Sequence, residues 1–385
     1  MRLIEINNPR EARAFIRVPL RLYRGDPNWI RPLDKDIHHV FDPAHNKLLR
    51  KGSCVRFIVE DGGEPIGRIA AFVNPATSQR QNQPTGGIGF FECMDSQQAA
   101  NMLFDAGKEW LTTHGMEAMD GPINFGERDR WWGCLIDGFT EPNYCCNYNP
   151  PYHAALFENY GFREYFRQFT FRWPMDTQLP EKYREKAERI ARNPGYSFRH
   201  VNKGDLDGYA EHFQVVYSKA WGKHHGVSEI APAQARALFR RMKPVLDEEI
   251  IWFGYYDEEP IAFFLMLPEV NQIFKHVNGK MNLLGKLKFI YHRWRGTCRK
   301  MFGVAFGIVP EHQGKGVEGA LVMAAASYIQ PLNRYDVFEM NWIGDFNPTM
   351  IKISENVGAH VAKTHVTYRY LFDRDKPFER HPMLE

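Results

Sequence analysis

The stretch HQGKGVEGALV, from His312 to Val322, follows the apolar run FGVAFGIVP and opens an alanine-rich run. A strand, a glycine-rich turn and a helix in this order can bind pyrophosphate, because glycines expose backbone N–H groups and a helix N-terminus carries partial positive charge. The glycines at 314, 316 and 319 fit neither a Walker A loop nor the GxGxxG fingerprint. The turn therefore predicts either a phosphate site of another kind or a structural loop.

Length and composition place the chain among ordinary globular proteins. With 385 residues, of which 44% are hydrophobic and 25% charged, we expect two or three domains. The six cysteines lack metal-ligand spacing and are interpreted as reduced thiols, so no metal is expected. No run approaches the roughly 18 apolar residues of a membrane span, and no signal peptide is recognised at the start. These features favour a cytoplasmic protein, and the net charge of +3 gives no reason to expect nucleic-acid binding.

The sequence repeats itself once. FIVEDGGEPIGRIAAFV and WFGYYDEEPIAFFLML each predict a strand hairpin, and their Glu-Pro-Ile triplets begin at Glu64 and Glu259, 195 positions apart. ENYGF at Glu158 and ENVGA at Glu355 form a second pair, 197 positions apart. Two matched pairs at nearly one offset indicate a tandem duplication.

Each copy alternates strands with helices of 3.6-residue periodicity, which predicts an α/β (α+β) fold of two similar domains. We expect a first domain over 1–175, a charged helical linker over 176–195 and a second domain over 196–385. Each copy is expected to end in a hairpin, the first over about Phe162 to Trp173 and the second within HVAKTHVTYRYLF.

Gln313-Gly314-Lys315-Gly316, between a strand ending in Val-Pro-Glu and an alanine-rich helix, resembles the acetyl-CoA motif of GNAT-type N-acyltransferases. Asn347-Pro348 and the helix PTMIKISENVGA resemble the family's downstream motif. The whole chain is similar to a group of bacterial tandem-GNAT proteins of uncharacterised activity. The resemblance implies two tandem GNAT-like domains, each a mixed, mostly antiparallel sheet flanked by helices. Acetyl-CoA or a longer acyl-CoA would bind at Ile308, Val309, Gln313, Gly314, Lys315, Gly316, Val317 and Asn347.

Two positions depart from the family pattern. Glu318 stands where the family has a small residue, and Ser354 stands at the position of the family's tyrosine, which protonates the leaving thiolate. The first copy has no glycine between Phe91 and Leu103, so we expect one acyl-CoA site, in the second copy, and a degenerate first domain.

On the acceptor side, the fold implied by the resemblance places the reacting centre where the fourth and fifth strands separate. Alternation puts Glu339 and Asn341 on one face of the fifth strand, and Glu339 is the preferred catalytic base. Ser354 is the second catalytic candidate. The residues expected to bind the amine are Trp221, His224, Asn341 and Asp345. In the first copy, the charged and aromatic cluster at 127–132 either binds substrate or plugs the space between domains.

Residues 274–300 carry eight Lys or Arg, and no acid occurs between Val270 and Pro310. Leu283, Leu287, Ile290 and Trp294 fall on one helical face. This basic amphipathic helix either contacts an anionic surface or ligand, such as a membrane, or packs on its own domain.

The sequence thus predicts an acyl-CoA-dependent N-acyltransferase that acts on a small-molecule or lipid amine. The alternatives are a non-catalytic CoA or lipid sensor and a transferase that uses another donor, such as aminoacyl-tRNA. The oligomeric state is left open.

Overall fold

The computed structural model describes residues 1–78, 83–126, 128, 130–221 and 230–384. None of the helices in these ranges is long and apolar enough to cross a bilayer. The first half of the chain contains β1 (Arg2–Glu5), α1 (Pro9–Leu22), α2 (Asp34–Val40), β2 (Ser53–Asp61), β3 (Glu64–Val73), β4 (Thr85–Cys93), α3 (Gln97–Thr113), β5 (Ala118–Gly121), β6 (Cys134–Asp137), α4 (His153–Tyr160) and β7 (Arg163–Pro174). The second half contains α5 (Glu181–Ala191), β8 (Tyr196–His200), α6 (Leu206–Trp221), α7 (Pro232–Met242), β9 (Ile251–Tyr256), β10 (Glu259–Pro268), α8 (Asn271–Val277), α9 (Leu283–Trp294), β11 (Lys300–Ile308), α10 (Val317–Ile329), β12 (Val337–Gly344), α11 (Pro348–Asn356) and β13 (His360–Leu371).

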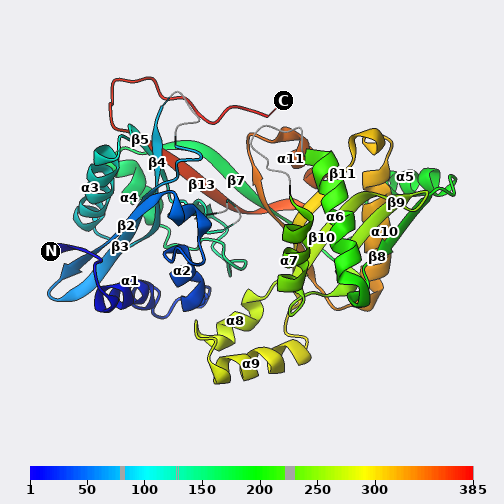
Figure 1. The fold of residues 1–385 in the computed structure, drawn as a ribbon, viewed down its shortest axis with the longest axis horizontal. Coiled ribbons are helices and arrows are strands. Elements are labelled where there is room, and N and C mark those ends of the chain that lie inside the picture. Colours follow the sequence, from blue (N-terminus) through cyan, green and yellow to red (C-terminus); the bar gives the residue numbers. More distant parts are fainter. Residues whose placement is uncertain (79–82, 127, 129, 222–229, 385) are drawn as a thin grey trace.

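The described strands form one continuous sheet that runs through both halves of the molecule (Figure 1). Its order is β1-β2-β3-β4-β5-β13-β7-β12-β11-β10-β9-β8, with β6 paired to β13. The pairs β4–β5 and β11–β12 are parallel, and the other pairs are antiparallel. The mixed, mostly antiparallel sheet flanked by helices agrees with the expected fold class.

Alternation along the strands decides which helix covers each face of the first half. Val59, Ile69 and Ala71 point to one face, where they pack in one core with residues of α3 and α4. Their neighbours Ile58 and Ala70 point to the other face and pack against α1. Because side chains alternate with a period of two, both faces of the central strands are buried under helices.

Both sequence repeats occupy equivalent places in the structure. The Glu-Pro-Ile triplets begin β3 and β10, and each of these strands pairs with the strand before it, which confirms the two predicted hairpins. In the second pair of repeats, Gly161 ends α4 and Gly358 follows α11, both with positive φ, a conformation that glycine adopts readily.

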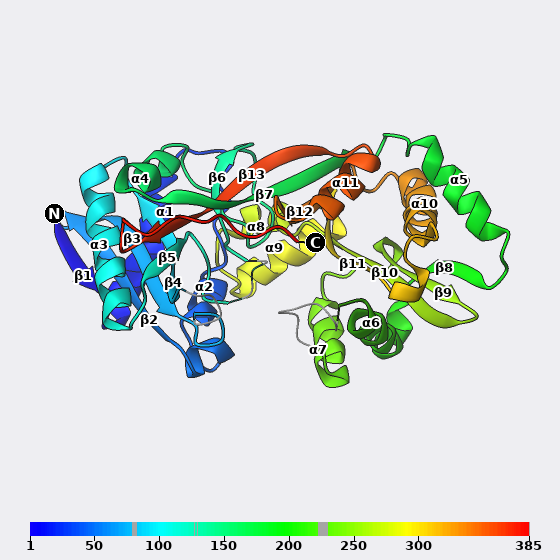
Figure 2. The same cartoon turned by 90° about the horizontal axis from the view of Figure 1, so that it is seen from above.

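The last strand of each half lies beside strands of the other half. The predicted terminal hairpins are wrong, because β7 and β13 are each one uninterrupted strand of 12 residues. β7 pairs with β12, whereas β13 pairs with β5, and the two long strands pair with one another. Figure 2 shows them running together across the molecule between the two halves. The two halves therefore exchange their final strands.

A buried cluster of charges holds the exchanged strand β7 against β12. Glu339 on β12 is fully buried and accepts two hydrogen bonds from Arg172 of β7, at 2.9 and 2.6 Å. Its second oxygen accepts from Asn143 at 2.7 Å and from Lys300 at 3.2 Å. Burial raises the pKa of Glu339, but Lys300, Lys363 and Arg172 outweigh burial and hold this pKa at about 2. The carboxylate is therefore charged at neutral pH.

The strand exchange predicts that a residue near the C-terminus stabilises the N-terminal core. Tyr368 of β13 is fully buried, stacks on Phe157 at 5.3 Å and donates to Glu158 at 2.9 Å. We expect Tyr368→Ala to lower the free energy of unfolding by about 3–5 kcal/mol, measured by urea denaturation of the full chain. Val361→Ala, at a half-exposed position of the same strand, is the control, and an equal loss in both variants would refute the exchange.

The low pKa of Glu339 predicts a pH-dependent contribution to stability. A carboxyl with a pKa of about 2 in the folded chain and about 4.3 in the unfolded chain stabilises the fold above pH ~4.5. This contribution disappears as the pH falls from about 4.5 to about 2. We expect Glu339→Gln to lose about 3 kcal/mol at pH 7, because the partly buried Arg172 and Lys300 would be left without their counter-charge. The difference in the free energy of unfolding between Glu339→Gln and the native chain should become smaller as the pH falls.

Asp345→Asn is the matched control for this experiment. Asp345 follows the same strand and pairs with the exposed Arg380 at 2.6 Å, so we expect a loss of at most about 1 kcal/mol. Urea titrations from pH 7 to pH 3 would measure both variants. Equal stability of Glu339→Gln and the native chain at pH 7 would contradict a charged, stabilising Glu339 carboxylate.

Candidate functional site

The glycine turn lies where the sequence places it, between β11 and α10. Gly314 and Gly316 both have positive φ, 71° and 96°, and Gly316 is the N-cap of α10. Gln313 turns back, and its side-chain amide donates to the Ile308 carbonyl at 2.8 Å. Val309 is buried, and its N–H donates to Ile261 on the neighbouring strand. These contacts fix the turn in a single shape at the end of the strand.

The turn presents a row of free backbone donors. No described residue accepts a hydrogen bond from the N–H groups of residues 314–319, and no side chain caps α10. The equivalent helix of the first half, α3, differs, because the hydroxyl of Ser96 accepts from Ala99 N–H at 3.3 Å and caps it. Free N–H groups at a helix N-terminus suit a phosphate, and the second half has such a row.

Helix α5 supplies positive charge beside this turn. Arg189 donates to the Lys315 carbonyl at 2.9 Å, and Lys186 pairs with Glu318 at 2.8 Å. The carboxylate of Glu318 is therefore paired with a cation, which reduces its repulsion of a bound phosphate. A Cβ on Gly316 would lie 2.6 Å from the Arg189 guanidinium, which would have to shift, and the φ of 96° itself favours glycine here.

The two parallel strands next to the turn separate and leave a cavity. β11 and β12 pair only from Lys300–Val337 to Gly303–Met340. A cavity of about 350 Å³ lies at this separation, within the usual size of ligand sites. Its walls are mostly apolar side chains of β11, β12, α10 and α11, and Glu318 is the one charged residue among the described residues that line it. The β7–α5 segment closes one side with Trp173, Met175, Leu179 and Tyr183.

The turn and the cavity together fit an acyl-CoA. The free donors of residues 314–319 would hold the pyrophosphate, the unpaired edge of β11 would meet the pantetheine amides, and the apolar walls would hold an acyl chain. No group of His, Cys, Asp or Glu in the described ranges is arranged to hold a metal ion.

The remaining residues predicted to bind ligand have diverse contacts. Asn347 lines the cavity and caps α11 by accepting from Met350 N–H at 3.2 Å. Asn341 lines the cavity and bonds to Asn143 at 2.9 Å. Asp345 instead pairs with Arg380 of the C-terminal segment. Trp221 ends α6, and His224 lies outside the described residues.

The two predicted catalytic residues are both engaged inside the protein. Glu339 has a pKa near 2, so it is a weak proton acceptor at neutral pH. Ser354 is fully buried, and its hydroxyl donates to the Met350 carbonyl at 3.0 Å. In these contacts Glu339 and Ser354 stabilise the site, and their catalytic assignment stays a prediction.

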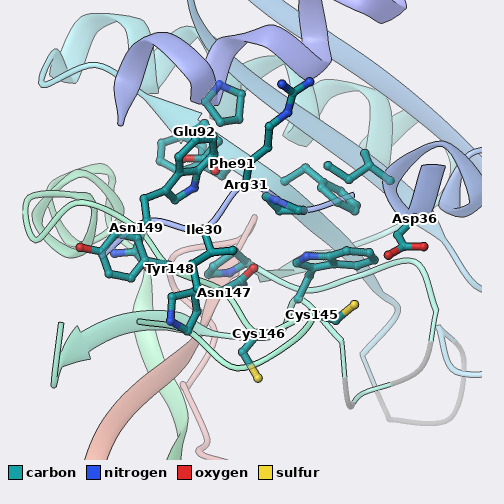
Figure 3. Close-up of a pocket in the computed structure, with 18 of the residues that line it drawn as sticks. Ile30, Arg31, Asp36, Phe91, Glu92, Cys145, Cys146, Asn147, Tyr148 and Asn149 are labelled. Carbon is teal, nitrogen blue, oxygen red and sulfur yellow. The ribbon is translucent and has the colours of Figure 1, made fainter. Parts of the chain in front are cut away.

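A second cavity lies in the first half, and Figure 3 shows side chains that line it. Phe91 and Glu92 of β4 lie on one side, and the segment from Cys145 to Asn149 lies on another. Trp131 of the predicted charged and aromatic cluster also lines it, whereas Glu127 and Asp129 lie outside the described residues. The linings of the two cavities touch, because Cys146 of this cavity accepts a hydrogen bond at 3.4 Å from Asn341, which lines the cavity between β11 and β12.

The sequence reasoning missed a buried polar cluster at this second cavity. Tyr23 donates to Glu92 at 2.6 Å, and Arg68 approaches the same carboxylate at 3.5 Å. Burial raises the pKa of Glu92 to about 7. Glu269, between the two halves, also has a pKa raised by burial to about 7. One signal could have found Glu92, namely an acid at the end of the apolar strand GGIGFFEC.

Comparison with known proteins adds two relatives. The chain is 26% identical to a bacterial ceramide synthase of Caulobacter vibrioides. The match extends over 375 residues, which are 95% of this chain and 96% of that protein. It is also 24% identical to Protein YghO of Escherichia coli, over 371 residues that are 94% of this chain and 93% of that protein. No family model matches the chain.

Solved structures show a more distant likeness. A tandem GNAT protein from the clavulanic acid biosynthesis pathway matches with a TM-score of 0.55 and 11% identity, over 97% of this chain and all of that one. A GCN5-related N-acetyltransferase from Sphaerobacter thermophilus matches with a TM-score of 0.50 and 13% identity, over 99% and 98%. At a coarse level, these likenesses and the ceramide synthase relative support an acyltransferase kind of function. The protein has the tandem GNAT fold.

Proposed function

We propose that this protein is an N-acyltransferase that moves a long acyl chain from CoA to a lipid amine. The observation that carries the proposal is the apolar cavity between β11 and β12, which begins beside the free N–H groups of residues 314–319. An acetyl group would need little of this cavity, whereas a long chain would bury its methylene groups against Val322, Ala325 and Ile329.

The chemistry of the transfer is simple. The ammonium of the acceptor loses a proton, its nitrogen forms a bond to the thioester carbon, and the carbon–sulfur bond breaks. The nitrogen then loses its second proton and the thiolate gains one, giving an amide and free CoA. This chain would contribute chiefly by holding the thioester at the separated strands and by excluding water with apolar walls.

The acceptor class is proposed from the relative and the second cavity. A ceramide is an N-acylated long-chain amino alcohol, and the Caulobacter relative is described as a ceramide synthase. In this chain the first-half cavity is one hydrogen bond away from the donor cavity, through Cys146 and Asn341. We place the body of a lipid amine on that side, near the membrane surface that such a lipid requires.

The donor site is tested by Gly316→Trp. We expect the native chain to release CoA from lauroyl-CoA when a long-chain amino alcohol such as sphinganine is present, and lauroyl-CoA to raise its Tm by several degrees. Trp at 316 would fill the space beside Arg189 and block the turn, so we expect kcat/KM to fall at least about 100-fold and the Tm shift to vanish.

Gly358→Trp is the control for backbone strain. Its φ of 87° is close to the 96° of Gly316, but no atom of the described residues lies within 4 Å of its Cβ position. An equal loss in both variants, or unchanged turnover in Gly316→Trp, would count against the donor site. A ligand-induced Tm shift without CoA release for any amine in a panel would favour the non-catalytic sensor.

The preference for a long chain is tested by filling the cavity. Val322 lies on α10 and lines the cavity, so Val322→Trp should shorten the space for an acyl chain. We expect turnover of lauroyl-CoA to fall at least about tenfold and turnover of acetyl-CoA to change less than about twofold. Tyr328→Trp, on an exposed part of the same helix, should change neither rate. Equal effects on both donors would mean that the acyl chain lies elsewhere.

A further inference from the structure

Helix α9 presents an exposed apolar face. The relevant side chains stand on one side of the helix and are half or more exposed: Leu283 76%, Leu284 61%, Leu287 56%, Ile290 62%, Tyr291 50% and Trp294 83%. Soluble proteins seldom gather large apolar side chains in one exposed patch unless the patch binds something. The face therefore requires a partner.

The opposite face of α9 is already packed against the protein. Phe289 meets Phe274 of α8 at 5.7 Å, and the ring of His292 stacks on His276 at 3.9 Å. Gly285 is buried, and its N–H donates to the side chain of Asn282, which caps the helix. These contacts fix the orientation of α9, so its apolar face points away from the domain core.

Cations border the apolar face on both sides. The residues that carry them are Lys280, Lys286, Lys288, Arg293 and Arg295, and no described carboxylate forms an ion pair with any of them. No Asp or Glu occurs between Val270 and Pro310. A face of Leu, Ile and Trp with uncompensated Lys and Arg at its borders is the pattern of helices that lie in a membrane interface.

The position of α9 in the molecule leaves the face accessible. Figure 1 shows α8 and α9 projecting from one edge of the molecule, away from the helices that flank the sheet. We infer that α9 docks on a membrane containing anionic lipids, with its apolar face at the level of the headgroups and its cations on lipid phosphates. A second copy of the chain fits less well, because two such faces would bring the same cations together.

The inferred docking extends beyond the proposed function and does not depend on it. It also orients the molecule, because α8 carries α9 and begins at Asn271, which lines the first-half cavity. A lipid that leaves the membrane beside α9 would therefore meet the side of the protein on which this cavity lies.

The test is sedimentation of the full chain with vesicles, without acyl-CoA or amine. We expect the protein to bind vesicles of phosphatidylcholine mixed with phosphatidylglycerol and to bind phosphatidylcholine alone at least about tenfold more weakly. Added salt should reduce the binding.

Leu287→Ser with Ile290→Ser should weaken partitioning at least about tenfold, because two exposed apolar side chains are lost. Lys280→Gln with Lys286→Gln should remove most of the preference for the anionic vesicles.

Two controls separate docking from misfolding and from general stickiness. Leu3→Ser with Met383→Ser removes exposed apolar side chains far along the chain from α9 and should leave binding within about twofold. Vesicles should shift the tryptophan emission of the native chain to the blue, and Trp294→Phe should lose most of this shift. All variants should keep the native Tm, because the replaced side chains are exposed.

Three results would overturn the inference. The native chain could fail to bind either vesicle, or the Leu287 and Ile290 double variant could bind as well as the native chain. Alternatively, the native chain could be a dimer without lipid and the same double variant a monomer, which would make α9 an interface between copies. Failure of CoA release with intact vesicle binding would refute the proposed function alone.

Discussion

The pairing of Glu339 with Arg172 and Lys300 joins the two halves of the sheet at its middle. A carboxylate without any exposure is tolerated only when cations and hydrogen-bond donors surround it, and here they come from β7, β11 and the loop at Asn143. Because Arg172 belongs to the first half of the chain, the pair sets the register of β7 against β12. Lys363 of β13, the other exchanged strand, also lowers the pKa of Glu339 through its positive charge.

This junction explains why the donor cavity is built by both halves. β12 keeps β7 as its partner along most of its length but follows β11 for only four residue pairs. With one side of β12 held, the other side is free to separate from β11 and open the cavity. Trp173 and Met175, at the end of β7, then close the cavity from the first half. The first half therefore supplies a wall of the site although it lacks a glycine turn.

Local patterns in the sequence predicted the local parts of this structure. The Glu-Pro-Ile hairpins, the turn at Gly316 and the amphipathic α9 depend on residues close together in the chain, so periodicity and spacing could identify them. The strand exchange could not be predicted in this way, because β7 and β13 would look the same whichever half they joined. The partners of Glu339 and Glu318 were equally hidden, since Arg172 and Lys186 lie more than 130 positions away. A segment expected to be a linker contributes α5, which packs on the turn.

The two helix N-termini show how the duplicated halves have diverged. In the first half the Ser96 side chain caps the start of α3 by accepting from Ala99 N–H, so one of its donors is already used within the protein. In the second half α10 starts on Gly316 with free N–H groups, and α5 brings Lys186 and Arg189 to it. Glu318 belongs to this arrangement because it holds Lys186 in place. Its negative charge is thus balanced within the protein, and the net charge beside the turn stays positive through Arg189 and Lys315, as an anionic donor requires.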